Sequence, residues 1–322
     1  MNLIDINTPK ETIADLLSGL GWIDKEEIKD ISSPGAGNMN VVLRVTTDQR
    51  TFILKQSRPY VQKYPDIPAP VERINTEYQF YKAIKDPTLD RHVPEIYHYH
   101  EEENLMMMED LGDCEDMSFI YSQRTIASNQ LEQLVQIIRQ VHEKEPPANF
   151  PMNMALRQLN HQHIFVLPFL EDNGFQLDDV QQGLQALSLN YKKDNLLKST
   201  INKLSQLYLS SGDTLIHGDY YPGSWMTRGS EVFMLDPEFC FVGFKEFDLG
   251  VMAGHLILST GDIGYCDKVT AFYKSPINIK LTKQVAGVEI MRRLIGLAQL
   301  PLDRNLSEKE DLLKKAYDMI MS

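Results

Sequence analysis

The chain has 322 residues, of which 43% are hydrophobic and 24% charged. These values are typical of globular proteins and exclude a disordered or low-complexity chain. The formal net charge of −13 argues against the broad basic face that nucleic-acid binding requires, although it still allows a local basic pocket. At about 150 residues per domain, the length predicts two domains or one large two-lobed fold.

Cysteine usage and the first residues indicate the compartment. The three cysteines are widely spaced and form no C-x-x-C pair, which favours free thiols in a reducing compartment over disulfides or a zinc site. The N-terminus lacks a basic region followed by an apolar stretch, and no window approaches about eighteen uninterrupted apolar residues. We therefore expect a cytoplasmic protein that binds neither membrane nor nucleic acid.

The first third of the chain carries strand signals between helices. Thr8–Glu11 has the pattern of a capping box with Pro9 at the first helical position, and it predicts a helix over the following residues. A small sheet with one helix lying across it is predicted next. Its strands are expected at 41–45, 52–55, 95–100 and 105–109, and its helix at 74–84.

Beyond residue 110 the hydrophobic pattern is mostly helical. Helices are predicted near 125–144, 178–190, 193–210, 246–260, 263–274 and 282–300, with only two strands, at 214–216 and 232–235. A second capping-box pattern at Ser307–Glu310 predicts the start of a last helix. The fold class is therefore α+β, with a β-rich N-terminal lobe over 1–110 and a larger helical C-terminal lobe over 111–322.

The segment His217–Ser224 carries the strongest signal for chemistry. A strand leads into a polar turn that presents Asp219, and Ser224 follows in a Pro-Gly turn. Phosphoryl transfer needs one aspartate to accept the proton of the substrate hydroxyl, and Asp219 has the position for this role. The alternative interpretation is a solvated acidic loop.

Two further carboxylates, Asp236 and Glu238, follow the next short strand. As i and i+2 neighbours in extended chain they point to one side, so we expect them to converge with Asp219 and the Ser224 hydroxyl. Oxygen ligands of this kind are the ones that Mg²⁺ selects, and a cation would relieve the repulsion between the carboxylates. The sequence therefore predicts a magnesium site.

A glycine-containing turn and a lysine in the N-terminal lobe have the pattern of a phosphate-binding element. Gly35 and Gly37, followed by Asn38, precede the first predicted strand, where glycines let backbone N–H groups approach phosphate; the alternative is a plain loop before a hairpin. Lys55 ends the second predicted strand. In the kinase layout a lysine here contacts the α- and β-phosphates and is oriented by a glutamate of the next helix, here Glu77 or Glu72.

Taken together, these motifs resemble the aminoglycoside phosphotransferase/choline kinase superfamily, whose fold is similar to that of protein kinases, and within it the methylthioribose kinases. The resemblance covers roughly residues 31–300. Four stretches carry it: Gly37-Asn38-Met39-Asn40; Lys55-Gln56 with Pro59-Tyr60-Val61; Asp236-Pro237-Glu238-Phe239 with Gly243 and Phe247-Asp248-Leu249-Gly250; and Met291 to Ala298 with its paired arginines. The chain departs from the family pattern at Tyr220-Tyr221-Pro222, which predicts a shift among 5-substituted riboses.

The resemblance implies a kinase that uses ATP and Mg²⁺ to phosphorylate the anomeric hydroxyl of 5-methylthioribose or a similar ribose. It implies that Asp219 is the catalytic base and that Arg292 and Arg293 lie beside the sugar and the transferring phosphoryl group. Asp236 and Glu238, with Ser224, would hold the metal. The nucleotide would be bound by Gly35, Gly37, Asn38, Lys55, Glu77 and, in the connector between the lobes, Glu109 and Leu111. A homodimer is implied by the resemblance alone.

The arginine pair and the acceptor leave alternatives open. Adjacent helical residues diverge by about 100°, so we expect one arginine to face the site less directly; the alternative is a surface pair bridged to Glu289. Other candidate functions are an aminoglycoside, choline or amino-alcohol phosphotransferase and a non-catalytic ATP-binding protein. Because two arginines would repel an aminium group, the sequence favours a neutral sugar.

Overall fold

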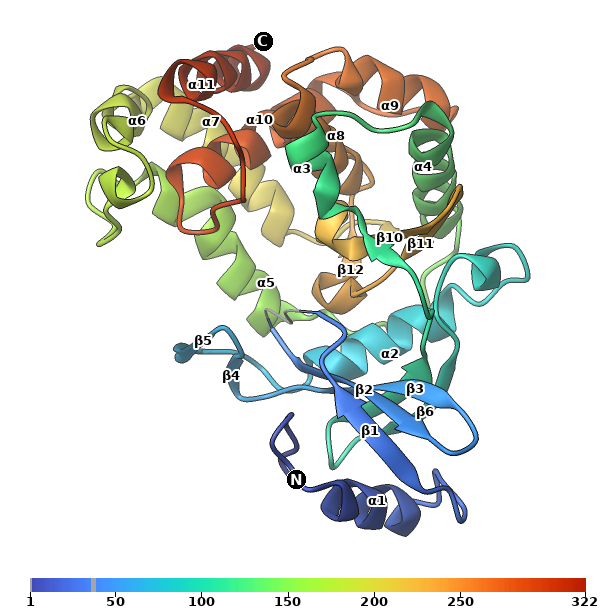
Figure 1. Cartoon of the computed structure of the whole chain (residues 1–322). Helices are drawn as coiled ribbons and strands as arrows, with labels where there is room; N and C mark the ends of the chain where they lie inside the picture. Colours follow the sequence, from blue (N-terminus) through green and yellow to red (C-terminus); the bar gives the residue numbers. More distant parts are fainter. Residues whose placement is uncertain (1, 36–38) are drawn as a thin grey trace. The chain divides into compact units, whose positions relative to one another are not determined.

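The computed structural model describes residues 2–35 and 39–322. The chain folds into two compact units, Met1–Cys114 and Glu115–Ser322 (Figure 1). The first is built around an antiparallel sheet and the second is mainly helical. The predicted α+β class, with a β-rich N-terminal lobe and a larger helical C-terminal lobe, is confirmed. Gly37 and Asn38 lie outside the described residues.

The first unit contains a five-stranded antiparallel sheet in the order β1-β2-β3-β7-β6. The strands are β1 (Ile28–Ser32), β2 (Val41–Thr47), β3 (Thr51–Gln56), β6 (Ile96–His100) and β7 (Leu105–Glu109), and a separate hairpin joins β4 (Tyr60–Val61) to β5 (Tyr64–Pro68). The four predicted strands are present. β1 was not predicted, because its sequence IKDIS lacks the regular alternation of a half-buried strand.

The two helices of the first unit cover opposite faces of this sheet. α1 (Lys10–Gly19) places Ile13 and Leu17 in one core with Leu54 of β3 and Met107 of β7. Since side chains alternate along a strand, Lys55 points to the other face. There α2 (Arg73–Ala83) contacts β6 and β7 (Figure 1). Strand alternation therefore brings Lys55 to the helix that follows it in the chain.

The predicted capping box at the start of α1 is wrong. Pro9 occupies the N-cap position, and no side chain caps the helix. The Thr8 hydroxyl instead accepts a hydrogen bond from the backbone N–H of Asp5, and the Asp5 carboxylate accepts one from Asn7. These local turn bonds compete with capping for the same side chain.

The second unit is built from helices with short strand pairs. Its helices are α3 (Ile120–Gln123), α4 (Ser128–His142), α5 (Met154–His161), α6 (Leu184–Lys192), α7 (Asn195–Leu209), α8 (Glu246–Thr260), α9 (Tyr265–Tyr273), α10 (Ile279–Ile295) and α11 (Leu306–Met321). Its strands pair as β9 (Thr214–Ile216) with β12 (Phe241–Gly243), and β10 (Trp225–Arg228) with both β11 (Glu231–Met234) and β8 (Glu115–Asp116).

Most predicted helices of this unit are present with shifted ends, but the prediction of only two strands is wrong. The structure adds the strands β8, β10 and β12, and it also adds the helices α3 and α5. Strands of two to four residues are too short to show a periodicity, so they cannot be separated from loops by pattern alone. The helix predicted from 178 begins only at Leu184, and the one predicted to 300 ends at Ile295.

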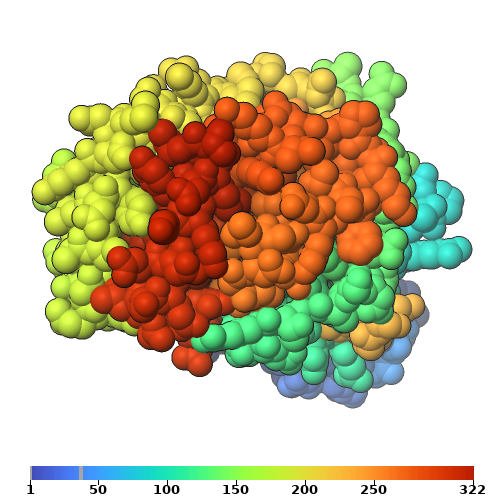
Figure 2. All heavy atoms as spheres, turned by 90° about the horizontal axis from the view of Figure 1, so that it is seen from above, coloured from blue at the N-terminus to red at the C-terminus, as the bar shows by residue number. Residues whose placement is uncertain are grey.

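Helix α10 lies at the centre of the second unit, packed against α8 on one side and α11 on another. The α8–α10 contact is close: a Cβ placed on Gly254 would lie 3.0 Å from the Cβ of Glu289. Figure 2 shows α11 at the surface beside the segment that contains α7. The capping box of α11 is Asn305 with Glu308, so the predicted box at Ser307–Glu310 is wrong by two residues.

Over residues 2–35 and 39–322, no helix is both long and apolar enough to cross a membrane.

Candidate active site

The loop after β9 begins with His217-Gly218-Asp219 and requires glycine at its second position. Gly218 has φ +84°, a left-handed conformation that residues with a Cβ rarely adopt. A Cβ at this position would also lie 2.1 Å from the carbonyl oxygen of Phe239. The loop can therefore lie directly against the segment 237–239 only because residue 218 is glycine.

Asp248, in the first turn of α8, holds the backbone of this loop. Its carboxylate is fully buried and accepts hydrogen bonds from the N–H groups of His217, at 2.7 Å, and Gly218, at 2.9 Å. The Nε2–H of His142 donates a third hydrogen bond, at 3.1 Å. Asp248 belongs to the stretch Phe247-Asp248-Leu249-Gly250 that carries the family resemblance, but no sequence motif indicated this role.

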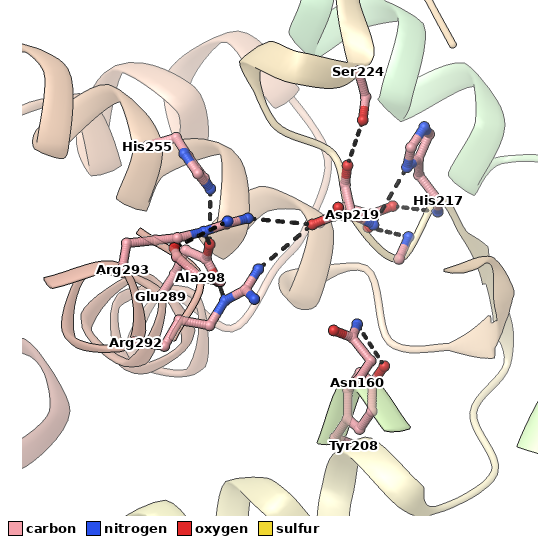
Figure 3. A network of polar contacts seen from close by, with 12 residues as sticks. Asn160, Tyr208, His217, Asp219, Ser224, His255, Glu289, Arg292, Arg293 and Ala298 are labelled. Carbon is pink, nitrogen blue, oxygen red and sulfur yellow. Dashed lines mark hydrogen bonds and ion pairs between the residues drawn. The ribbon is translucent and has the colours of Figure 1, made fainter. Parts of the chain in front are cut away.

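The main chain of Asp219 is held on both sides (Figure 3). The His217 ring donates from Nε2 to the carbonyl of Leu235, at 2.8 Å, and its Nδ1 accepts the Asp219 N–H, at 3.3 Å. The Ser224 hydroxyl donates to the Asp219 carbonyl, at 2.9 Å. Ser224 therefore bonds the backbone of the loop in this structure.

The carboxylate of Asp219 faces two arginines of α10. Its Oδ1 lies 3.5 Å from an Nη2 of Arg292 and 3.8 Å from that of Arg293, and the Asp219 side chain is 20% exposed. The expectation that one arginine faces the site less directly is wrong, because both reach the same oxygen. Burial raises the pKa of Asp219, and the charges of Arg293 and Arg292 partly oppose that rise.

Glu289 lies between the two arginines and binds both. Its buried carboxylate accepts hydrogen bonds from Nε of Arg292 and from Nε of Arg293, the latter at 2.8 Å. Burial alone would raise the pKa of Glu289, but Arg292 and Arg293 hold it well below its usual range. The alternative prediction was a surface pair of arginines bridged to Glu289. The arginines are buried, so their predicted surface location is wrong, but the predicted bridge to Glu289 is present.

A histidine and two tyrosines complete this network. His255 of α8 donates from Nε2 to Glu289, at 2.7 Å, and its Nδ1 accepts from the hydroxyl of Tyr121, at 2.6 Å. Burial lowers the pKa of His255 to about 4, so its ring is neutral near pH 7. The ring of Tyr221 lies 5.1 Å from the guanidinium carbon of Arg293 and 4.9 Å from the His255 ring. Sequence motifs gave no signal for His255 or Tyr121.

The predicted geometry of Asp236 and Glu238 is wrong. Asp236 has φ 58°, a left-handed conformation, and the 3-10 helix Pro237–Phe239 follows it, so the two residues are not i and i+2 neighbours in extended chain. The part of the chain that the structure describes contains no cluster of three His, Cys, Asp or Glu side chains that could hold a metal ion. The expected convergence of three carboxylates is therefore absent there.

The charge of Asp236 nonetheless acts on Tyr221, a residue of the Asp219 network. The charges of both Asp219 and Asp236 contribute to raising the pKa of Tyr221, although burial is the main cause. Mg²⁺ usually retains several waters and takes one or two protein carboxylates together with phosphate oxygens. The donor set of Asp236 and Glu238 is compatible with that coordination without a third carboxylate.

In the first unit, Lys55 forms a buried ion pair with Glu77. Its Nζ lies 2.7 Å from one carboxylate oxygen of Glu77 and 2.9 Å from the other, and the two side chains are 3% and 0% exposed. Of the two glutamates considered, the structure thus places Glu77 against the lysine, while Glu72 occupies the N-cap position of α2.

The remaining predicted nucleotide residues that the structure describes are Gly35, Glu109 and Leu111. The Gly35 carbonyl accepts a hydrogen bond from the Ser33 hydroxyl, at 2.7 Å. Glu109 ends β7 and accepts a hydrogen bond from the N–H of Glu95, at 3.1 Å, and Leu111 follows it in a partly exposed segment.

Residues 30–273 match the model of the phosphotransferase enzyme family. The chain belongs to this family. It is 29% identical over 253 residues to a methylthioribose kinase of Exiguobacterium sibiricum, a match that covers 74% of this chain and 64% of the relative. It is also 29% identical over 335 residues to a methylthioribose kinase of Geobacillus sp. strain WCH70, covering 87% and 81%.

A solved structure supports the fold. The crystal structure of a spectinomycin phosphotransferase in complex with ADP and spectinomycin superposes with a TM-score of 0.54 at 11% identity, covering 98% of each chain. At this identity the likeness concerns the fold alone. The family, the relatives and the fold agree with the resemblance that the sequence motifs indicated.

Proposed function

We propose that this protein is an ATP-dependent small-molecule kinase that phosphorylates the anomeric hydroxyl of 5-methylthioribose or a similar 5-substituted ribose. The observation that carries the proposal is the buried pair Arg292 and Arg293, with both guanidinium groups on the carboxylate of Asp219. Membership in the phosphotransferase enzyme family and similarity to two proteins named methylthioribose kinase support it.

In the second unit, Asp219 accepts the proton of the acceptor hydroxyl. Its raised pKa makes it a stronger proton acceptor than an ordinary aspartate. Arg292 and Arg293 stabilise the negative charge of the transferring phosphoryl group, because fixed guanidinium groups in a buried site need no reorganisation as that charge develops. The hydrogen bonds of Asp248 and Ser224 to the loop backbone keep Asp219 in place.

In the first unit, Lys55 binds the phosphates of ATP and Glu77 orients its ammonium group. Gly35, with Gly37 and Asn38, covers the phosphates, and Glu109 and Leu111 contact the rest of the nucleotide. This assignment gives residues 1–110 the nucleotide-binding role and residues 111–322 the acceptor-binding role.

Asp236 and Glu238 are proposed to hold the magnesium ion, and their carboxylate oxygens suit it. When bound, Mg²⁺ neutralises charge on the nucleotide phosphates. Ser224 was expected to assist at the metal, but its hydroxyl donates to the Asp219 carbonyl. A hydroxyl that donates one hydrogen bond retains acceptor lone pairs, so this bond leaves its role as a ligand open.

The charges around Asp219 favour a neutral acceptor. The ion pairs of Arg292 and Arg293 with Glu289 and Asp219 place two guanidinium groups directly beside the Asp219 carboxylate. A sugar hydroxyl can accept hydrogen bonds from the guanidinium groups, whereas an aminium group would be repelled by them. Choline, amino alcohols and aminoglycosides are therefore the competing acceptors that a test must include.

The proposal is tested by ADP release from purified protein with ATP, Mg²⁺ and single acceptors. We expect turnover of 5-methylthioribose or a close 5-deoxyribose analogue, and no turnover of choline or kanamycin. Robust phosphorylation of an aminoglycoside with no activity on any ribose would overturn the assignment of the acceptor. ATP binding without turnover of any acceptor would indicate a non-catalytic protein.

Arginine variants test the observation on which the proposal rests. Arg292→Ala and Arg293→Ala should each lower kcat/KM for the sugar, and the double variant should lower it by about 10²-fold or more. ATP binding measured without sugar should be nearly unchanged. The exposed Arg228, which pairs with Glu231 on the surface, supplies the matched control Arg228→Ala, expected to retain activity.

A further inference from the structure

Both arginines face Asp219 although they are neighbours on one helix. Side chains at consecutive helical positions point about 100° apart. Residues three and four positions after a given residue, however, both lie on that residue's face of the helix. Arg292 and Arg293 stand in this relation to Glu289, so one carboxylate can draw both guanidinium groups to one side of α10.

The hydrogen bonds show how the carboxylate does this (Figure 3). Glu289 binds each arginine through Nε, at the base of the guanidinium group. The contacts of both arginines with Asp219 are made by Nη2, at the outer end of the group. Binding the base of a planar group fixes the direction of its outer end, so Glu289 determines where both guanidinium groups point.

Glu289 is itself fixed by elements outside α10. His255 of α8 donates to the same carboxylate, and the Tyr121 hydroxyl of α3 donates to the other nitrogen of that ring. A Cβ at position 254 of α8 would lie 3.0 Å from the Cβ of Glu289, so glycine there lets α8 approach Glu289 closely. Glu289, His255 and Tyr121 are each no more than 3% exposed, so water cannot replace these bonds.

We propose that Glu289 is a positioning residue that aligns Arg292 and Arg293 on Asp219, and that His255 and Tyr121 hold Glu289 in that orientation. The inference rests on the proposed function, in which the two arginines stabilise the transferring phosphoryl group. Glu289 contacts the arginines rather than the reacting atoms. Its removal should therefore affect kcat more than the KM for ATP.

The position of the two guanidinium groups gives a readout that needs no turnover. In the wild type their Nη2 atoms lie 3.5 Å and 3.8 Å from Oδ1 of Asp219. If Glu289 sets this position, its substitution should withdraw at least one guanidinium group from Asp219. A crystal structure of the variant measures this directly.

Two substitutions of Glu289 separate the effect of its charge from the effect of its side-chain length. Glu289→Gln keeps the shape and removes the charge, and we expect kcat to fall by about 10²-fold, as for a misplaced catalytic group, with at least one guanidinium group withdrawn from Asp219. Glu289→Asp keeps the charge but shortens the side chain, so its kcat should also fall and the guanidinium groups should again be displaced. The matched control is Glu246→Gln, a buried glutamate of α8 that accepts a hydrogen bond from the N–H of Asn278, and it should change neither kcat nor the positions of the guanidinium groups.

Wild-type kcat in Glu289→Gln, or a loss of kcat with both guanidinium groups still beside Asp219, would overturn the proposal. Should Glu289→Gln fail to fold, Tyr121→Phe removes one hydroxyl from the same chain of contacts. It should lower kcat by about 2- to 10-fold, the equivalent of one hydrogen bond, with KM for ATP unchanged. An unaltered kcat in Tyr121→Phe would then overturn the proposal.

A measurement without turnover separates this inference from the proposed function. The crystal structure of Glu289→Gln shows where the guanidinium groups point, whatever the acceptor is. If the wild type phosphorylates no ribose but at least one guanidinium group of Glu289→Gln has left Asp219, the proposed acceptor is wrong and the role of Glu289 stands. Unchanged positions of both guanidinium groups overturn the role of Glu289.

Discussion

Asp248 binds two consecutive N–H groups of the His217-Gly218-Asp219 loop, and Asp248→Asn tests how far the loop depends on it. Asparagine has nearly the same shape but a single acceptor oxygen, and its amide group is a donor. It can therefore serve only one of the N–H groups of His217 and Gly218, and its NH₂ faces the other. Rotating the amide by 180° exchanges its oxygen and its NH₂ group, but one of the two backbone N–H groups still lacks an acceptor.

The magnitude follows from these contacts. A buried backbone N–H left unpaired costs about 1–3 kcal/mol, and the bond that remains loses the strength of a charged acceptor, about 1 kcal/mol. We expect the free energy of unfolding of the second unit to fall by about 2–4 kcal/mol, which is less than the typical total of about 5–15 kcal/mol. The variant should stay folded, but kcat should fall by about 10- to 100-fold because Asp219 is displaced.

The two tryptophans allow the second unit to be observed alone. Trp22 lies in the first unit and the fully buried Trp225 in the second. In a Trp22→Phe background, urea unfolding followed by fluorescence reports on Trp225. Asp213→Asn is the control, because Asp213 is an exposed aspartate just before β9, and it should change stability by no more than about 0.5 kcal/mol.

If Asp248→Asn unfolds at the urea concentration of the Asp213→Asn control, with the same slope and an unaltered kcat, the loop does not depend on Asp248. A loss of kcat without loss of stability would show that Asp248 acts on the reaction rather than on the fold of the loop.

Three further predictions concern the proposed catalytic groups. Asp219→Asn should lower kcat by about 10²–10⁴-fold with little change in ATP affinity, and near wild-type turnover in this variant would remove Asp219 from the mechanism. Because burial raises the pKa of Asp219, the wild-type kcat should decline on the acid side at a higher pH than an ordinary aspartate would give. Asp236→Ala should abolish activity and make nucleotide binding insensitive to Mg²⁺, and an unchanged Mg²⁺ titration would place the metal elsewhere. Lys55→Met should cost about 3–5 kcal/mol by leaving the Glu77 charge buried. Adding Glu77→Gln should restore most of that stability but not ATP affinity, measured by calorimetry.

The elements with clear periodicity were predicted well because one short stretch of sequence determines them. The short apolar runs of β3 and β7 gave both strands, and the spacing of apolar residues gave α4, α7 and α8. Helix caps were less predictable. Asn305 to Glu308 and Ser307 to Glu310 both satisfy the capping-box pattern, and only the structure shows that the first is used. The pattern states which pairs could form, and the packing of α11 decides between them.

In the candidate site, too, residues close together in the sequence were predicted, whereas residues brought together from distant parts of the chain were not. Asp219, Ser224 and Asp236 were found because they lie in one short segment. Asp248 lies about thirty residues further along, and its role depends on a helix whose first turn reaches back to the loop. The contact between His255 and Tyr121 joins residues separated by 134 positions. No spacing rule connects such residues, because tertiary packing alone brings them together.

Two interpretations of the arginine pair were alternatives in the sequence: an ion pair with Glu289 and a site beside the acceptor. The structure shows that the two are compatible. A bridge from Glu289 to each arginine was the structural alternative to a site beside the acceptor. In the structure each guanidinium group is large enough to bind Glu289 with its Nε and to face Asp219 with its Nη2. The bridge is therefore compatible with the proposed role and supplies the alignment that helix geometry alone would deny. It also balances the arginine charges, so that on the proposed function the buried pair can stabilise a transferring phosphoryl group without attracting a permanently bound anion.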